Sequence, residues 1–321
     1  MRATIGTPTG RVTCGSTDEL LAAVAGEPFA VLELDELPPD VRRHLGLSEL
    51  HLLGLHEPPP TYRIRVAGGG LEAVVPVADE GGCTPVYVVA TSELVASVHR
   101  GPSIDLGEYC ERVRWDGDRR AAAASFLFGE MALGTFRAAI REIRARLDDL
   151  EDDMVAGTHR LQLLELTRIH RRISKMRRGL GEYGDALTDV EDELVSGMEL
   201  PEHVMRLAQR HNAAATSVLA ELGGLRDEAA NVGELHRSLT STRQSLVINR
   251  LTVIAALLLP LTFVTGFFGM NFNWLVEHIE SAAKFWLLGI ATPIAVATVI
   301  TVLMWRAGWL FVFEPDDDDR P

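Results

Sequence analysis

The sequence predicts an α+β cytoplasmic domain, built from an α/β sheet layer and long helices, that is joined to a two-helix transmembrane hairpin. Three observations support this fold class. Residues 251–276 and 285–305 contain no charged side chain. Residues 119–200 contain no proline and are rich in helix formers, and residues 1–118 hold short β-rich runs between glycine and proline turns. These patterns indicate membrane spans, long helices and a sheet, respectively.

Residues 1–118 are predicted to form the cytoplasmic α/β domain. Glycine and proline clusters punctuate this region and mark its turns. Helices are expected at Asp18–Val24 and Pro39–Leu45. The expected strands are Phe29–Leu34, Thr61–Val66, Leu71–Val77 and Val86–Ala90.

Residues 119–200 are predicted to form antiparallel cytoplasmic helices. Apolar residues recur every three or four positions in Ala123–Leu150 and Leu161–Leu180. Acidic and basic residues occur in separate blocks, with acids at 148–153 and bases at 168–178. One interpretation is solvated faces that pair across the hairpin. The other is a group of carboxylates that attracts hydrated Mg²⁺.

Residues 201–250 are predicted to form a long stalk helix. No proline occurs from Glu202 to Leu259, which predicts a helix about 87 Å long at 1.5 Å per residue. Its apolar residues follow a nearly heptad spacing, so the helix should pack against parallel copies or other neighbours. These residues are Val218, Leu222, Leu225, Ala229, Val232, Leu235, Leu239 and Leu246.

Residues 251–271 and 285–305 are predicted to cross a membrane, because each run reaches the roughly 20 residues that a spanning helix needs. Residues 272–284 form the loop between them, and residues 306–321 form a short acidic tail. Arginines flank the spans on the side away from this loop, which predicts a multi-pass plasma (inner) membrane protein with both termini cytoplasmic. These arginines are Arg237, Arg243, Arg250 and Arg306.

Charge and composition narrow the function. The chain has 321 residues, with 45 acidic and 31 basic side chains and a net charge of -14. Nucleic acid is excluded as a partner because phosphate binding needs a basic surface. Cations are compatible with this balance. The sequence contains no nucleophile–base set and no nucleotide-binding loop, so neither an enzyme nor a cofactor is expected.

The end of the first span carries a recognisable motif. It reads Thr265-Gly266-Phe267-Phe268-Gly269-Met270-Asn271, preceded by Pro260-Leu261-Thr262-Phe263 and followed by a short loop and a last span. This arrangement resembles the CorA family of divalent metal ion (magnesium/cobalt) transporters, of the GMN-motif type. The resemblance implies a homopentameric funnel of stalk helices around a pore lined by the first span. Zinc-transporting relatives share this architecture.

The resemblance implies that Gly269, Met270 and Asn271 form the selectivity filter. A ring of Asn271 oxygens can bind a cation through its hydration shell, which suits Mg²⁺ because this ion sheds water reluctantly. Neutral oxygens hold the ion weakly enough to release it. Gly269 lets the backbone turn at the helix end. Gly269 can also be a simple helix cap and Asn271 a turn residue, and both roles can coexist with the filter.

The resemblance also implies a row of pore-lining residues along the first span and the stalk. Leu251 and Leu259 would form apolar rings, and Glu234 a ring of carboxylates. The alternatives are helix packing for the leucines, a hydroxyl bonded to its own helix for Thr262, and a solvated face for Glu234. The complete row is Thr262, Leu259, Leu251, Ile248 and Glu234.

Two further regions differ from, or add to, the family pattern. Glu277 and Glu280 in the loop would raise the cation concentration at the pore mouth. On the stalk, where such transporters often carry the acidic half of a regulatory metal site, this chain has Gln209, Arg210 and His211.

The leading hypothesis is a channel for Mg²⁺, with Co²⁺ or Ni²⁺ as further ions, driven by the membrane potential. Its partners would be further copies of the chain, membrane lipid and the transported cation. A second hypothesis is a proton-coupled Zn²⁺ transporter. A hypothesis of another class is a non-conducting, membrane-anchored sensor or scaffold.

Overall fold

The computed structural model of the chain forms two compact units, Met1–Glu234 and Leu235–Pro321, which are described separately. The longest helix, α6 (Glu202–Phe268), contributes to both units. The described residues are 3–7, 10–25, 29–35, 62, 64–67, 70–91, 93–98, 104–112, 120–157, 159–197, 202–270 and 281–306.

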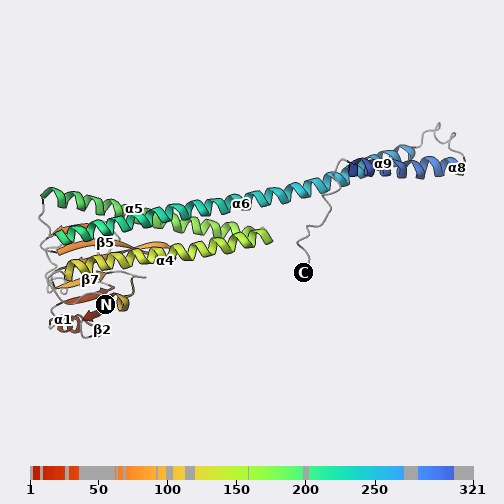
Figure 1. Cartoon of the computed structure of the whole chain (residues 1–321). Helices are drawn as coiled ribbons and strands as arrows, with labels where there is room; N and C mark the ends of the chain where they lie inside the picture. Colours follow the sequence, from red (N-terminus) through yellow and green to blue (C-terminus); the bar gives the residue numbers. More distant parts are fainter. Residues whose placement is uncertain are drawn as a thin grey trace. The chain divides into compact units, whose positions relative to one another are not determined.

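The first unit contains a seven-stranded sheet with the strand order β2-β1-β3-β7-β6-β5-β4 (Figure 1). Strands β3 and β7 pair in parallel, and the other neighbours pair antiparallel. The β5–β6 hairpin is the longest ladder and runs from Leu71 opposite Ala90 to Asp79 opposite Gly82. The strands are β1 (Ala3–Thr7), β2 (Gly10–Cys14), β3 (Ala30–Leu34), β4 (Ile64–Ala67), β5 (Gly70–Asp79), β6 (Gly82–Ala90) and β7 (Leu94–Val98).

The four strands expected from the sequence correspond to β3, β4, β5 and β6, although their ends differ by a few residues. Strands β1, β2 and β7 were missed. All five residues of β7 are buried, so this strand lacks the apolar–polar alternation that identifies a half-exposed strand. The helix expected at Asp18–Val24 is α1 (Thr17–Val24). The helix expected at Pro39–Leu45 lies outside the described residues.

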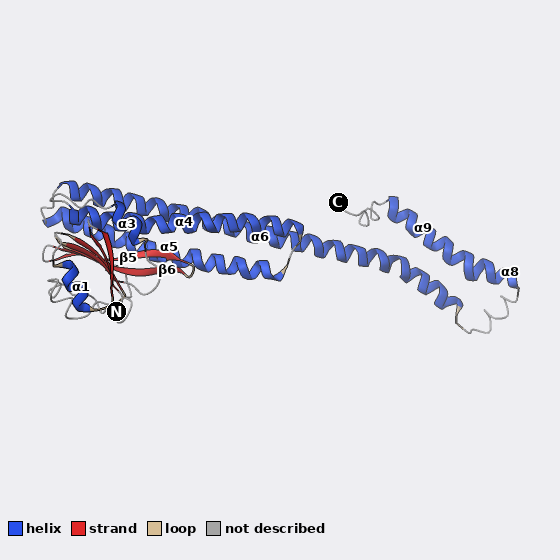
Figure 2. Ribbon diagram, turned by 90° about the horizontal axis from the view of Figure 1, so that it is seen from below, coloured by secondary structure: helices blue, strands red, loops and turns tan. Residues whose placement is uncertain are grey.

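Helices cover both faces of the sheet (Figure 2). Helix α1 packs on one side, where Leu20 is fully buried among residues such as Ile5 and Leu32. Its first turn is fixed by reciprocal bonds, because Ser16 Oγ accepts from Glu19 N–H and Glu19 Oε2 accepts from Gly15 N–H. On the other side lie α3 (Leu106–Arg112), α4 (Arg120–Ala156) and α5 (Arg160–Gly197).

Helices α4 and α5 form the predicted antiparallel hairpin, and charged side chains connect them. Arg146 pairs with Glu165, and the Arg172 guanidinium binds both oxygens of Glu142 at 2.9 and 3.1 Å. Arg172 Nε also donates to the carbonyl of Asp79 at the β5–β6 turn. Of these residues only Arg172 belongs to the charge blocks that the sequence singles out, so the pairing of the acidic block with the basic block stays a prediction.

In the first unit, α6 packs beside α4 and α5 (Figure 1). Arg144 of α4 binds both oxygens of Glu228 at 3.1 and 3.3 Å. The heptad-like stripe of the sequence is buried here, with Val218, Leu222 and Leu225 at 0% exposure. From Val218 to Val232 the stripe therefore packs against helices of its own chain, which is the second of the two kinds of partner that its spacing predicted, whereas Leu246 at its end is 37% exposed.

The second unit contains the remainder of α6 and a returning helical segment. This segment consists of α8 (Ala282–Lys284), a π-helix η1 (Phe285–Ala291) and α9 (Thr292–Arg306). The sequence predicted an α-helix over residues 285–305, whereas the first seven of these residues form the π-helix η1. The hydroxyl of Thr292 donates to the carbonyl of Leu287, five residues earlier, which matches the wider turn of a π-helix.

Two described helices are long and apolar enough to cross a membrane, namely α6 and the segment Gly289–Arg306. Only 6% of the most apolar stretch of α6 and 11% of that of the second segment is buried in the chain. A core helix of a water-soluble protein would be mostly buried. The exposure therefore favours lipid or further copies of the chain as the surroundings of these helices.

Candidate ion path

The first span ends at the motif that the sequence singled out. The N–H of Gly269 donates to the carbonyl of Thr265 at 3.0 Å, and the N–H of Met270 donates to that of Phe267 at 3.3 Å. Gly269 does not adopt the left-handed conformation. A methyl group added there would lie 3.2 Å from the Thr265 carbonyl oxygen, so glycine permits a close approach of backbone at the helix end. Asn271, Glu277 and Glu280 lie outside the described residues.

The predicted apolar pore residues are exposed in the chain. Ile248 is 62% exposed, Leu251 65% and Leu259 73%. Packing within their own chain therefore does not account for these side chains. Lipid, other copies of the chain, the contents of a pore and solvent remain as their surroundings.

Thr262 bonds to its own helix, because its hydroxyl donates to the carbonyl of Leu258 at 2.8 Å. This bond uses the only proton of the hydroxyl and leaves oxygen lone pairs unused. The water molecules around a hydrated cation donate hydrogen bonds outward, so they need oxygen lone pairs as acceptors. A hydroxyl bonded to its own helix and a pore-lining role are therefore compatible for Thr262.

The remaining predicted path residue, Glu234, has an exposed side chain. In the part of the chain that the structure describes, no ion pair involves it. Likewise, no group of three or more His, Cys, Asp or Glu side chains that could hold a metal ion occurs among those residues of one chain.

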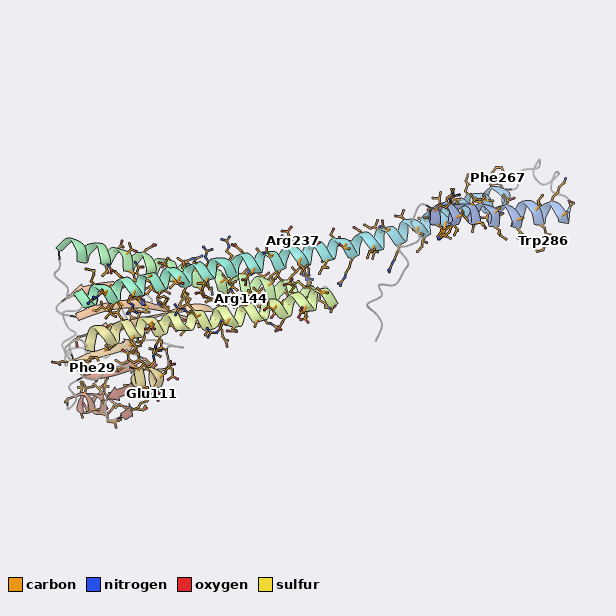
Figure 3. The ribbon with its side chains drawn as sticks, in the orientation of Figure 1. Phe29, Glu111, Arg144, Arg237, Phe267 and Trp286 are labelled. Carbon is orange, nitrogen blue, oxygen red and sulfur yellow. The ribbon has the colours of Figure 1, made fainter. Side chains whose placement is uncertain are left out.

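The two spans approach each other through one shallow apolar groove in the second unit. Leu261 of α6 and a face of α9 around Ala297 and Thr298 line it. The hydroxyl of Thr298 donates to the carbonyl of Ile294, so it adds little polarity to the groove. Figure 3 places Phe267 and Trp286 at the same end of this unit. Aromatic side chains at span ends are typical of a membrane interface.

A buried polar contact, which the sequence did not reveal, fixes α6 to the two helices beside it in the first unit. Tyr183 Oη and His211 Nε2 are 2.8 Å apart, and the ring of Phe126 packs edge-on against His211. His211 is 6% exposed, and its burial lowers its pKa to about 4. Gly129 makes room for the imidazole, since a methyl group there would lie 2.6 Å from Cε1. His211 is therefore a neutral packing residue.

The first unit is an α+β domain built on a sheet. The longest helix of the chain continues into an exposed apolar segment, and a second apolar helix follows. This combination is typical of a class of membrane proteins that join an α+β domain to two membrane spans. The chain belongs to the family described as CorA-like Mg2+ transporter protein, which matches residues 74–306. This match confirms the resemblance seen in the sequence. Membership in a family of transporters also confirms the prediction that the protein is not an enzyme.

Relatives and solved structures agree with this assignment. The cobalt/magnesium transport protein CorA of Thermotoga maritima is 28% identical over 160 residues, which cover 49% of this chain and 40% of that protein. The chain spans less than half the length of the curated relatives it matches.

Two solved structures show the same fold. The CorA magnesium transporter of Methanocaldococcus jannaschii is 15% identical and has a TM-score of 0.76, with 96% of this chain and 98% of that chain covered. The ZntB cytoplasmic domain of Vibrio parahaemolyticus is 12% identical and has a TM-score of 0.52, with 75% and 98% covered.

Proposed function

We propose that the chain is a divalent-cation channel of the CorA type, with Mg²⁺ as its main ion and Co²⁺ and Ni²⁺ as further ions. The observation that carries the proposal is the first span itself. It is an unburied apolar helix in a chain of this transporter family, and it ends at Gly269 and Met270, directly before Asn271.

The pore is formed by several copies, because two spans cannot enclose a path by themselves. We propose five, with both termini in the cytoplasm and the assembly in the plasma (inner) membrane. The exposed apolar side chains of α6 are then shared between the pore, the neighbouring copies and lipid. Native mass spectrometry of the purified protein in detergent tests the copy number, and any mass other than five chains contradicts it.

Selectivity in this proposal comes from neutral oxygens. The amide oxygens of the Asn271 ring accept hydrogen bonds from the inner water shell of the ion, so Mg²⁺ passes without losing water. Glu277 and Glu280 raise the local cation concentration outside the filter. The membrane potential supplies the driving force, which is about 4.6 kcal/mol per 100 mV for a doubly charged ion.

Below the filter, α6 provides two kinds of surface. Thr262 presents oxygen lone pairs, whereas Leu259, Leu251 and Ile248 present apolar side chains. A narrow apolar ring conducts when it is wet and closes when water leaves it. These apolar residues are therefore the proposed gate. Glu234 is the proposed carboxylate ring beyond the gate.

The test is uptake of Mg²⁺, Co²⁺, Ni²⁺ and Zn²⁺ into proteoliposomes under an imposed membrane potential. Asn271→Ala should abolish the preference among these ions. Asn273→Ala removes the same side chain two positions later and serves as the matched control, which should conduct like the wild type. Absence of flux for every ion in the wild type would overturn the transport proposal. Unchanged ion preference in the Asn271 variant would overturn the filter.

The same assay addresses the zinc hypothesis, which the likeness of fold to a ZntB domain keeps in view. A proton-coupled Zn²⁺ transporter would show Zn²⁺ uptake that follows an imposed pH gradient at constant membrane potential. Mg²⁺ uptake that follows the potential and ignores the pH gradient supports the channel.

A further inference from the structure

One side of α5 carries a regular row of exposed side chains. The opposite side of the helix is buried, with Ile173 at 0% exposure, Leu180 at 1% and Ile169 at 7%. Steps of three and four residues keep side chains on one face of a helix, so the exposed positions form a continuous line. This line, named here the outer row, consists of Leu161, Leu164, Arg168, Arg171, Lys175 and Arg178.

The four cations of the outer row have no counter-charge. Their charged neighbours Glu165 and Arg172 are engaged by Arg146 and Glu142. Within the described residues, no ion pair involves the side chains of the four cations. Like charges three or four residues apart on a helix repel one another. The two leucines at the start of the row are 75% and 53% exposed, so the row joins uncovered apolar surface to uncompensated basic surface.

The C-terminal end of the chain has the complementary chemistry. Residues 309–313 read Trp-Leu-Phe-Val-Phe, and residues 314–319 contain five acids and one proline. Residues 309–319, named here the tail segment, lie outside the described part of the chain. Acidic blocks at the end of a chain are typical interaction segments. The tail segment and the outer row thus each join an apolar part to a charged part, and the two charges are opposite.

The two segments also present these parts in the same order. Gly129 of α4 contacts His211 of α6, and further along both helices Arg144 binds Glu228, so α4 and α6 run parallel. Helix α5 runs antiparallel to α4 and therefore begins at the end of the first unit towards which α6 continues into the charge-free run. Its leucines lie nearest to that end and its cations follow. Along the tail segment, the apolar residues likewise come before the acids.

The lengths agree as well. The outer row covers about 26 Å of helix at 1.5 Å per residue, and the tail segment extends to at most about 36 Å. Gly233 of α6 lies beside Leu166 of α5, and the helix from Gly233 to Leu251 is about 27 Å long. In the proposed topology Leu251 and Arg306 both lie at the cytoplasmic ends of the spans, and the chain from Arg306 to Asp316 extends to at most about 36 Å. The acids of the tail segment can therefore reach the cations of the row.

We propose that the outer row binds the tail segment of a neighbouring copy, with residues 309–313 on the leucines and the acids on the cations. This inference rests on the assembly of several copies in the proposed function. A neighbouring copy supplies the tail because the row faces away from α6 of its own chain, which Tyr183 and Leu166 contact from the buried side of α5. Exposed ion pairs are individually weak. A tail that is tethered within the assembly has an effective concentration in the millimolar range, which makes weak contacts sufficient.

The test uses two full-length chains with different affinity tags. One chain carries Arg171→Cys and the other carries Asp317→Cys, and assemblies that contain both tags are purified and mildly oxidised. We expect a disulfide-linked dimer that carries both tags, and oxidation in 1 M salt should reduce its yield several-fold, because the Debye length falls to about 3 Å. Absence of this dimer from assemblies that contain both tags overturns the docking of the tail. Chains that do not co-purify overturn the assembly of several copies instead.

Two controls limit the result to the outer row. Arg141→Cys replaces an exposed arginine of α4 that makes no ion pair within the described residues, and it should give no dimer with Asp317→Cys. As much dimer from this pair as from the Arg171 pair contradicts a specific site. Wild type with the same oxidant controls for Cys14, Cys83 and Cys110.

The order of the contact is tested by further cysteine pairs. Leu164→Cys should link to Leu310→Cys, and Arg178→Cys should link to Asp318→Cys. Exchanging the two partners should lower the yield of dimer several-fold, because positions 164 and 178 lie about 21 Å apart along α5. Equal yields from the matched and the exchanged pairs contradict the proposed alignment.

Discussion

Helix α6 carries apolar side chains in both units, and the two units treat them in opposite ways. In the first unit, Leu222 and Leu225 are 0% exposed against α4 and α5, whereas in the second unit Leu251 and Leu259 are 65% and 73% exposed. Leucines of α6 thus stabilise the fold in the first unit, whereas in the second unit they are exposed and available to partners outside the chain. The difference separates the residues that stabilise the first unit from those that are exposed and available for the proposed assembly, lipid contact and conduction.

The largest expected effect follows directly from this contrast. Leu222→Ala should lower the free energy of unfolding by about 3 kcal/mol, because it removes buried apolar contacts and leaves a cavity. Leu259→Ala should change it by less than about 0.5 kcal/mol, because that side chain has few contacts in its own chain. Thermal unfolding of the full chain in detergent, followed by circular dichroism, measures both. Similar losses in the two variants would mean that the units do not differ as described.

The second prediction concerns pH and the first unit. Burial lowers the pKa of His211 to about 4, whereas an unfolded histidine titrates near 6.5. Between these two pH values the unfolded chain therefore binds more protons than the folded chain. The contribution of neutral His211 to the free energy of unfolding is complete above pH 6.5 and is lost as the pH falls towards 4. At pH 4.5 the expected loss is about 2.5 kcal/mol relative to pH 7.5.

His211→Gln removes the titrating group and serves as the reference for this prediction. Carboxylates titrate in the same range in both proteins, so the difference between wild type and variant isolates His211. Urea unfolding at pH 7.5 and 4.5 provides the measurement. If both proteins lose the same stability on acidification, the histidine is not buried as described.

The sequence predicted the elements whose signals are local. The charge-free runs predicted the two helices that are long and apolar enough to cross a membrane, and the apolar periodicity of residues 123–150 and 161–180 predicted the helices α4 and α5. The parallel pairing of β3 with β7 was not predicted. The paired residues lie about sixty positions apart in the sequence, and no local pattern encodes so distant a neighbour. The contact between His211 and Tyr183 was missed for the same reason. The candidate site was predicted from the family resemblance that the local motif at residues 265–271 carries, and its residues stay a prediction.

The third prediction uses two glycines of α4 to sharpen the contrast within the first unit. Gly129→Ala should cost about 2 kcal/mol, because the added methyl group would lie 2.6 Å from His211 and force α6 away from α4. Gly134→Ala is the matched control, since nothing lies within 4 Å of the added atom. Alanine there should stabilise the helix by about 0.5–1 kcal/mol. Equal midpoints of thermal unfolding for the two variants would contradict the close packing of α6 at His211.

The smallest effect is expected from an ion pair at the surface of the first unit. The Arg172 side chain is 16% exposed and binds Glu142 through two nitrogens and the Asp79 carbonyl through Nε. Its hydrogen bonds lower the pKa of Glu142. Lysine cannot make this forked contact, so Arg172→Lys should cost about 1 kcal/mol.

Arg171→Lys is the matched control for the ion pair, because the neighbouring arginine is exposed and makes no ion pair within the described part of the chain. This change should leave the midpoint of thermal unfolding unaltered. High salt should reduce the difference between the two variants, since Glu142 is 64% exposed and its charge is open to screening. A difference that persists undiminished in 1 M salt would instead assign the stabilisation to the uncharged bond from Arg172 Nε to the Asp79 carbonyl, which holds the β5–β6 turn against α5.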